Sequence, residues 1–396
     1  MRILIATAGS RGDVEPFANL ARRAVAEGHD VLLVVPDRSG VDLDGLDVAS
    51  LGVDFNRMIT DQGVSALGAM RSFRSVVRPL MRAVIVETAK VALDYRPDVV
   101  VAHPKILSAP LIAEALNIPH VLVETVPAMT PTSAFPAAGT VTRNLGRANR
   151  LTYRAAGMAA AMFRSEIDEA ARLVAVSRRT VASPVATLMP ISPAILARPG
   201  DWPDTVHLTG PWLDDRAPGV VDPVVAEFLE GGPYVYVGFG SMAGGDPIER
   251  ARSVVQAVRD HGTRAILATG LGGLDVPRDL LGPDLLVVRS TDHGRVLPRA
   301  VAAVHHGGIG TVQAATRAGT VSVLVPFIAD QPFWGARLHA QGLAPAPIPR
   351  RALTSKRLTA ALADAASHQG GVDSAARTMN QEQGTREALS VIVSLV

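Results

Sequence analysis

The stretch from Val301 to Gln331 constrains the fold of this chain more than any other. A short apolar run leads into a glycine-rich turn, an apolar-periodic segment follows, and a second apolar run ends before a polar pair. This pattern predicts a βαβ unit, which belongs to a parallel sheet covered by helices. The expected elements are a strand over Val301 to Val304, a turn over His305 to Gly310, a helix over Thr311 to Ala318 and a strand over Val321 to Pro326.

The turn of this unit has the composition of an anion site. Its glycines let the backbone approach a ligand closely, and Thr311 begins the helix, so free amide groups and the positive end of the helix dipole meet at one spot. A phosphate suits such a spot, and His305 and His306 add imidazole donors beside it. The alternative is a tight structural turn with surface histidines. The glycines are Gly307, Gly308 and Gly310.

Asp330 and Gln331 follow the second strand of the unit. They stand at its carboxyl end, where the ligands of parallel sheets collect. Because a carboxylate beside a phosphate site suits hydroxyl groups better than a further phosphate, we interpret this pair as a sugar-binding pair.

Length and composition predict two domains of ordinary size. A chain of 396 residues that is 48% hydrophobic can bury two cores. The net charge of +2 gives no electrostatic case for binding nucleic acid, and the absence of cysteine excludes disulfides and thiolate metal sites. No apolar run reaches the roughly 18 residues of a membrane-spanning helix. We expect a soluble, cytoplasmic protein of undetermined oligomeric state.

The N-terminus repeats the order of strand, turn and helix. A strand over Arg2 to Ala6 and a helix over Pro16 to Glu27 lead to a second strand that ends before Asp37. A dinucleotide enzyme would hold a ribose with such an acid, but the turn containing residues 9–12 (GSRG) is not G-x-G-x-x-G. A second candidate turn, residues 238–243 (GFGSMA), matches that fingerprint more closely, yet the strand after it ends without an acid. A nicotinamide cofactor is therefore disfavoured.

Between these units the chain is less regular. Glu124 to Gly146 is a long loop rich in proline, threonine and alanine, and long loops in compact domains are usually functional. Leu173 to Ser177 and His207 to Gly210 are expected to be strands. Residues 211–223 (PWLDDRAPGVVDP) form a linker by their proline, glycine and acid content, which places a domain boundary there.

Taken together, these motifs resemble the donor-binding signature of nucleotide-sugar-dependent glycosyltransferases of GT-B fold, in the branch that modifies bacterial natural products and sterols. The similarity extends over most of the chain, and its motifs are residues 305–311 (HHGGIGT) and 329–335 (ADQPFWG). The resemblance implies an α/β fold of two facing, doubly wound parallel-sheet domains with a cleft between them. The implied parts are an acceptor domain (1–210), a nucleotide-sugar domain (224–374) and a C-terminal helix (375–396) that packs back on the first domain.

The resemblance also implies roles for individual residues. Asp13 would be the catalytic base, at a position where relatives carry histidine, and Ser10, Arg11 and Gly12 would line the cleft. The alternative is that Asp13 only caps the helix, since it lies just ahead of Pro16. The implied diphosphate ligands are Ser241, His293, His305, Gly307, Gly308, Gly310 and Thr311. The implied ligands of the donor sugar are Asp330 and Gln331.

The expected reaction is an inverting transfer from a UDP- or dTDP-sugar to a hydroxyl of an apolar acceptor of polyketide, glycopeptide, polyphenol or sterol type. It requires no metal or other cofactor, because a helix N-terminus and histidines meet the charge of the diphosphate. The pair Asp42 and Asp44 has the D-x-D spacing of a metal site, but we expect a solvated turn there. A sugar-nucleotide epimerase of the same fold and a non-catalytic sugar-nucleotide-binding protein remain as alternatives.

Overall fold

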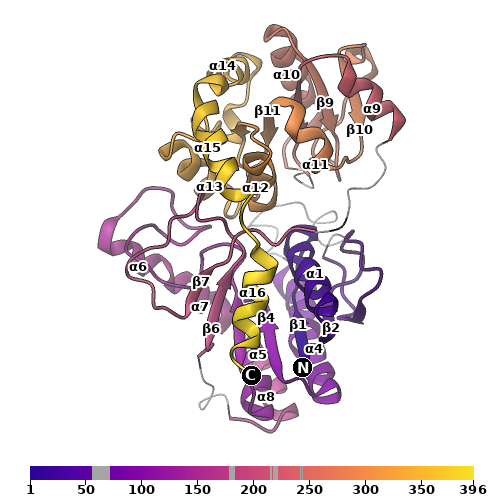
Figure 1. Cartoon of the computed structure of the whole chain (residues 1–396). Helices are drawn as coiled ribbons and strands as arrows, with labels where there is room; N and C mark the ends of the chain where they lie inside the picture. The colour runs from indigo at the N-terminus through magenta and orange to yellow at the C-terminus, as the bar shows by residue number, and fades with distance from the viewer. Residues whose placement is uncertain (56–71, 178–182, 215, 217–221, 241, 243) are drawn as a thin grey trace. The chain divides into compact units, whose positions relative to one another are not determined.

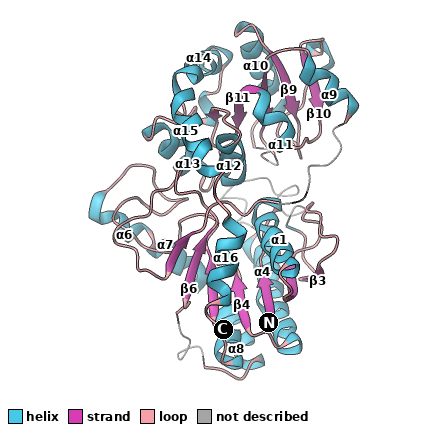
Figure 2. Cartoon of the chain, viewed as in Figure 1, coloured by secondary structure: helices cyan, strands magenta, loops and turns pink. Residues whose placement is uncertain are grey.

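The computed structural model describes residues 1–55, 72–177, 183–214, 216, 222–240, 242 and 244–396. These residues form two compact units. The first contains the described residues up to 214 together with Glu382–Val396, and the second contains those from 216 to 381. Each unit is a parallel sheet with helices packed on it (Figure 1; Figure 2). The expected α/β class with two doubly wound sheets is therefore confirmed.

The first unit is built on a seven-stranded sheet in the order β3-β2-β1-β4-β5-β6-β7. All the paired strands run parallel. The order reverses between β1 and β4, and ligands of such sheets bind outside the carboxyl ends of the strands at this switch point. The strands are β1 (Arg2–Ala6), β2 (Asp30–Val35), β3 (Asp47–Ser50), β4 (Val99–Ala102), β5 (His120–Val123), β6 (Ala186–Met189) and β7 (Val206–Leu208).

Alternate side chains of these strands enter two separate cores, because successive residues of a strand point to opposite faces. Ile3 and Ile5 of β1 pack beneath α1 (Arg11–Ala26) and α16 (Gly384–Val393). Leu4 and Ala6 enter the core on the opposite face. The helices of that face are α4 (Arg78–Tyr95), α5 (Ala109–Leu116) and α8 (Arg164–Leu173), and the shorter helices of the unit are α6 (Asn149–Thr152) and α7 (Arg154–Ala161).

The C-terminal helix completes the core around α1. Ala388, Leu389 and Ile392 of α16 are buried in the same cluster as Phe17 of α1 and Trp212. Figure 1 shows α16, in yellow, lying beside α1 in dark blue. The last residues therefore belong to the first unit, although the residues just before them in sequence belong to the second.

The second unit has a five-stranded parallel sheet in the order β10-β9-β8-β11-β12. Its order reverses between β8 and β11. The strands are β8 (Tyr234–Gly238), β9 (Arg264–Ala268), β10 (Leu285–Val288), β11 (Ala300–His305) and β12 (Ser322–Leu324). The helices are α9 (Pro223–Glu230), α10 (Pro247–Asp260), α11 (His293–Val296), α12 (Ile309–Arg317), α13 (Gln331–Ala340), α14 (Ser355–Ala365) and α15 (Gln369–Met379).

The βαβ unit expected around the glycine turn is confirmed as β11, α12 and β12, with the helix beginning two residues early at Ile309. The strand expected over Leu173 to Ser177 is wrong. Helix α8 runs to Leu173, and Ala175 then takes a left-handed conformation with φ of 57° that ends it. A short apolar run cannot by itself distinguish a strand from a helix end. Part of the expected linker lies outside the described residues. No helix in the described part of the chain is long and apolar enough to cross a membrane.

We predict that replacing Leu389 by alanine destabilises the first unit, because Leu389 is buried in the core that α16 shares with α1. Such truncations cost about 2–5 kcal/mol. Val393→Ala, in the same helix but at an exposed position, should change stability by less than about 0.5 kcal/mol. Denaturation followed by tryptophan fluorescence measures both. Equal stability losses in the two variants would contradict the packing of α16.

Candidate functional site

Asp13 lies at the switch point of the first sheet, just after β1 and in the first turn of α1. Its Oδ2 accepts a hydrogen bond from the backbone N–H of Ser10 at 2.9 Å. Its Oδ1 accepts one from Nζ of Lys105 at 2.9 Å, and 23% of the Asp13 side chain is exposed. The carboxylate therefore satisfies a free amide at the start of its helix and pairs with a cation at the same time. Capping of the helix therefore engages only Oδ2 of Asp13, and Oδ1 pairs with Lys105.

His103 stands on the other side of this carboxylate. Its Nε2 lies 3.5 Å from Oδ1 of Asp13, and its Nδ1 accepts the backbone N–H of Lys105 at 3.1 Å. Because Nδ1 is an acceptor, the proton of the neutral ring is on Nε2 and points towards Asp13. Burial lowers the pKa of His103 to about 3, and the neighbouring charge of Lys105 acts in the same direction. The ring is therefore neutral at physiological pH.

The charge state of Asp13 follows from these neighbours. Burial acts to raise the pKa of its carboxyl, but the charge of Lys105 and the hydrogen bonds from Lys105 and Ser10 together lower it below its usual value, and His103 adds to this only when it is protonated. With His103 neutral, Lys105 supplies most of that stabilisation. Asp13 is thus a carboxylate throughout the neutral range, which is the protonation state that a general base requires.

Gly9 makes room for this arrangement. Its φ of 144° is one that side-chain-bearing residues rarely adopt. A Cβ on Gly9 would lie 2.0 Å from Oδ2 of Asp13 and 2.7 Å from Nζ of Lys105. Only glycine lets the carboxylate and the ammonium group meet over the turn.

The other residues of this turn lie on its outer side. Ser10 is the N-cap of α1 and is half-buried. Arg11 and Glu15 form an exposed pair one helical turn apart, with Nη2 and Oε1 at 2.9 Å. Nothing lies within 4 Å of where a Cβ on Gly12 would be. Glu15, the other acid of this turn, is thus committed to Arg11 on the helix surface.

Sequence reasoning did not single out Glu124, although it is an acid that directly follows a buried strand. It is fully buried, and its Oε2 accepts backbone N–H groups of Ala128 at 3.1 Å and Met129 at 2.8 Å. The hydroxyl of Thr130 donates to its other oxygen. Burial raises the pKa of Glu124, and these hydrogen bonds oppose the rise. The long loop after β5 is therefore folded around a buried carboxyl group.

The glycine turn of the second unit lies after β11, beside the switch point of its sheet. Gly307 has a φ of 91°, and a Cβ there would approach Leu324 to 3.0 Å. Helix α12 has Gly308 as its N-cap, and its first intrahelical bond runs from Val312 N–H to Gly308 O at 3.0 Å. The amides of residues 309–311, including those of Gly310 and Thr311, precede that bond. They have no partner within the helix and are available to an anion.

The two histidines of this turn differ in their surroundings. His305 is fully buried, its Nδ1 accepts the N–H of Gly307 at 3.2 Å, and its Nε2 lies 2.9 Å from the hydroxyl of Ser322. Both of its nitrogens thus have a partner, one in the turn and one on β12. His306 is half-buried, and within the described structure its Nδ1 has no hydrogen-bond partner. Burial lowers the pKa of His306 to about 4, partly offset by a hydrogen bond with the backbone of Gly238.

The remaining expected donor residues are also in the second unit. His293 begins α11, and its Nε2 lies 2.9 Å from the hydroxyl of the buried Tyr236. Burial raises the pKa of Tyr236 to about 12, so the phenol keeps its proton. The ring centroids of His305 and His306 lie 6.4 Å apart, and, besides burial, a positive charge on His293 acts to lower the pKa of both. Ser241 lies outside the described residues.

Asp330 and Gln331 sit where β12 leads into α13, and both are engaged with the protein. Oδ2 of Asp330 accepts Nε1–H of the buried Trp334 at 2.8 Å. Oε1 of Gln331 accepts the backbone N–H groups of Phe327 at 2.8 Å and Ile328 at 3.0 Å. The Gln331 side chain is buried and shapes the turn that carries Asp330.

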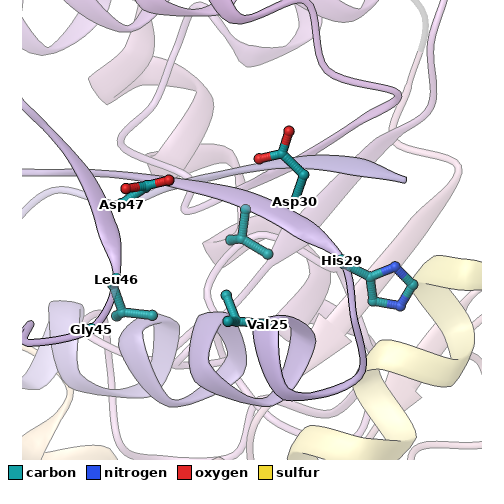
Figure 3. Close-up of a pocket in the computed structure, with 7 residues that line it drawn as sticks. Val25, His29, Asp30, Gly45, Leu46 and Asp47 are labelled. Carbon is teal, nitrogen blue, oxygen red and sulfur yellow. The ribbon is translucent and has the colours of Figure 1, made fainter.

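Two features of the first unit lie apart from Asp13. The backbone N–H of Asp44 donates to Oδ1 of Asp42 at 3.0 Å in an exposed turn, and no group of three described residues is arranged to hold a metal. A hollow of about 420 Å³ lies at the amino ends of β2 and β3, the sheet edge opposite Asp13. In Figure 3 its polar side chains, His29, Asp30 and Asp47, lie on different sides and do not converge.

Comparison with known proteins identifies the family. Residues 3–136 match the Glycosyltransferase family 28 N-terminal domain. The chain is 33% identical, over 91% of its own length and 89% of the relative, to O-mycaminosyltylonolide 6-deoxyallosyltransferase of Streptomyces fradiae. The chain belongs to the glycosyltransferases. This glycosyltransferase is also 29% identical, over 99% of its length, to the sterol 3-beta-glucosyltransferase of Cryptococcus neoformans, of which it spans 27%.

The fold of this glycosyltransferase matches a solved structure of the same kind. It superposes on the glycosyltransferase VinC, which was solved in complex with dTDP, with a TM-score of 0.68 and 18% identity, covering 100% of this chain and 99% of VinC. At that identity the match establishes the fold, which is GT-B.

We predict that Lys105→Met raises the pKa of Asp13. Without the ammonium group, burial still opposes ionisation while the main stabilising charge is gone. Carboxyl carbon chemical shifts followed against pH measure the change directly. Lys90→Met, which removes an exposed lysine paired with Glu87, is the matched control and should leave the titration of Asp13 unchanged. An unaltered Asp13 titration in Lys105→Met would show that the ion pair is not formed in solution.

Proposed function

We propose that this glycosyltransferase moves a sugar from a UDP- or dTDP-sugar to a hydroxyl of an apolar natural product or sterol, inverting the anomeric carbon. The observation that carries the proposal is Asp13, a carboxylate held ionised and partly exposed at the switch point of its sheet. By their names, two relatives transfer a sugar to O-mycaminosyltylonolide and to sterols. These names support a hydroxyl-bearing acceptor of natural-product or sterol type.

The second unit supplies what a nucleoside diphosphate needs. Free amides at the start of α12 and the positive end of its dipole meet the charge, and His306 lies in the same turn with a buried Nδ1 that has no hydrogen-bond partner within the described structure. Thr311 adds a hydroxyl in the same turn. His305 acts through the backbone of the turn, and His293 stands nearby. The complex of VinC with dTDP supports a nucleoside diphosphate as the ligand.

The proposed reaction is one displacement. The acceptor oxygen bonds to the anomeric carbon while the bond from that carbon to the diphosphate oxygen breaks, and the electron pair leaves with the diphosphate. The acceptor proton passes to Asp13. Backbone amides and imidazole stabilise the leaving diphosphate, a role that a metal ion would otherwise have. Asp330 accepts hydrogen bonds from the hydroxyl groups of the sugar. Gln331 fixes the turn that presents Asp330.

Two other functions make different predictions. An epimerase of the same fold would rearrange the nucleotide sugar without an acceptor, and a binding protein would leave both substrates unchanged. Mass spectrometry after incubation with the donor alone, and then with donor and an acceptor panel, separates the three. A glycosylated product that forms only when both are present supports the proposed function.

We predict that Asp13→Asn lowers turnover by a factor of about a hundred to ten thousand, the usual contribution of a general base. The amide can still accept from Ser10 but cannot take the acceptor proton. Donor affinity should not change, because the donor residues belong to the other unit. Turnover is measured by product formation in EDTA, since the proposal includes no metal.

Glu15→Gln is the matched control for this variant. It alters an acid in the same helical turn that is already paired with Arg11, and its turnover should remain near that of the wild type. If Asp13→Asn keeps more than about a tenth of the wild-type rate, Asp13 is not the base. Loss of wild-type turnover in EDTA would show that the reaction needs a metal.

We predict that His306→Ala weakens binding of UDP or dTDP about tenfold or more, the effect of losing a hydrogen bond to a charged group. Calorimetry with the nucleotide alone measures it. His261→Ala is the control, because His261 also has an unpaired Nδ1 but ends α10 at the opposite edge of the sheet. Equal affinity in wild type and His306→Ala would remove His306 from the diphosphate site.

A further inference from the structure

One segment of the first unit has a composition unlike the rest of the chain. Between Glu124 and Glu166 the sequence has no acidic residue, yet it holds five arginines. The whole chain has 39 basic against 37 acidic residues, so these arginines exceed its entire positive surplus. They are Arg143, Arg147, Arg150, Arg154 and Arg164.

The same segment exposes large apolar side chains. Met158 is 73% exposed, Leu151 is 57% and Met162 is 54%. No other large apolar side chain in the described part of the chain is as exposed as Met158. Soluble proteins rarely leave several such side chains together in water unless the surface has a partner.

Helix geometry aligns these residues. A 3-10 turn over Gly146–Ala148 leads into α6 and α7, and Met162 continues the helical backbone just after α7. The spacings of three and four residues then place Arg147, Leu151, Arg154, Met158 and Met162 along one side. The opposite side is anchored, because Asn149 is buried and the buried Tyr153 donates to the backbone oxygen of Phe135 at 3.2 Å. We call the exposed side, with Arg143 beside it, the 143–162 face.

The arginines of this face are not neutralised by the protein. Arg150, nearby, lies 3.4 Å from Asp201. Within the described residues, no carboxylate lies within ion-pairing distance of Arg143, Arg147 or Arg154. A solvated surface helix would ordinarily mix both signs of charge. This face instead combines positive charge with apolar side chains.

We propose that the 143–162 face binds the surface of an anionic lipid bilayer. Arginine guanidinium groups would pair with lipid phosphates while Leu151, Met158 and Met162 enter the boundary between head groups and acyl chains. A second copy of the chain fits less well, because a symmetric dimer would bring arginine against arginine. The proposal concerns a surface and does not depend on the reaction assigned to the protein.

The test is co-sedimentation of the full chain with vesicles. We expect binding to vesicles of phosphatidylglycerol and phosphatidylcholine in equal parts, much weaker binding to phosphatidylcholine alone, and release as salt is raised. The triple variant R143Q/R147Q/R154Q should bind the anionic vesicles about a hundredfold less tightly, since each arginine contributes a factor of roughly five. The variant L151S/M158S/M162S should also lose binding.

The matched control is R351Q/R377Q/R386Q, which removes three exposed arginines elsewhere on the chain and should bind as the wild type does. Absence of wild-type binding to the anionic vesicles, or equal binding by the R143Q/R147Q/R154Q variant and the control, would overturn the proposal. So would a wild-type dimer that dissociates in L151S/M158S/M162S, seen by light scattering, because the face would then be a contact between copies. The salt dependence of the wild type tests the charge contribution even if a variant fails to fold.

Discussion

The constraint on which both units depend is that all their paired strands run parallel. A parallel pair needs a crossover, so each strand delivers its carboxyl end, and the loop after it, to the same edge of its sheet. In the first unit this brings together Asp13 after β1, His103 after β4 and Glu124 after β5. In the second it brings together the turns that follow β8, β11 and β12. Functional side chains can therefore be placed at these edges without disturbing the packing of the cores.

The polar groups at these edges are of two kinds: some stabilise a turn through hydrogen bonds, and others remain available for binding or catalysis. His305 and Gln331 are buried, and each accepts hydrogen bonds from backbone N–H groups of its turn, while their remaining nitrogens contact the side chains of Ser322 and Met242. Glu124 does the same for the loop after β5. Asp13 belongs to both groups, because one oxygen caps its helix while the other meets a lysine from a different crossover. Its low pKa is the electrostatic result of that pairing, since burial alone would have raised it.

The sequence was most informative where a local pattern has one physical meaning. Glycines between an apolar run and a helical segment predicted the turn after β11. The role of Asp13 came only from the resemblance, because an acid at the start of a helix can equally be a cap. The sequence was least informative where the outcome depends on distant residues. Lys105 is 92 positions from Asp13, and nothing local marks it as a partner. The different roles of His305 and His306 depend on which of the two rings faces Ser322. The apolar run that begins at Leu173 was predicted to be a strand because so short a run has no periodicity that distinguishes a strand from the end of a helix.

The return of α16 to the first unit makes the second unit an insertion within the first. A ribosome delivers residues in order, and domains fold largely as they emerge. The second unit can therefore close its sheet while the first still lacks α16, with the apolar side of α1 around Phe17 uncovered. The first unit is therefore the first to be synthesised and the last to complete its core. Until Leu389 and Ile392 are synthesised, the nascent chain carries an open core that a chaperone, or another nascent chain, can reach.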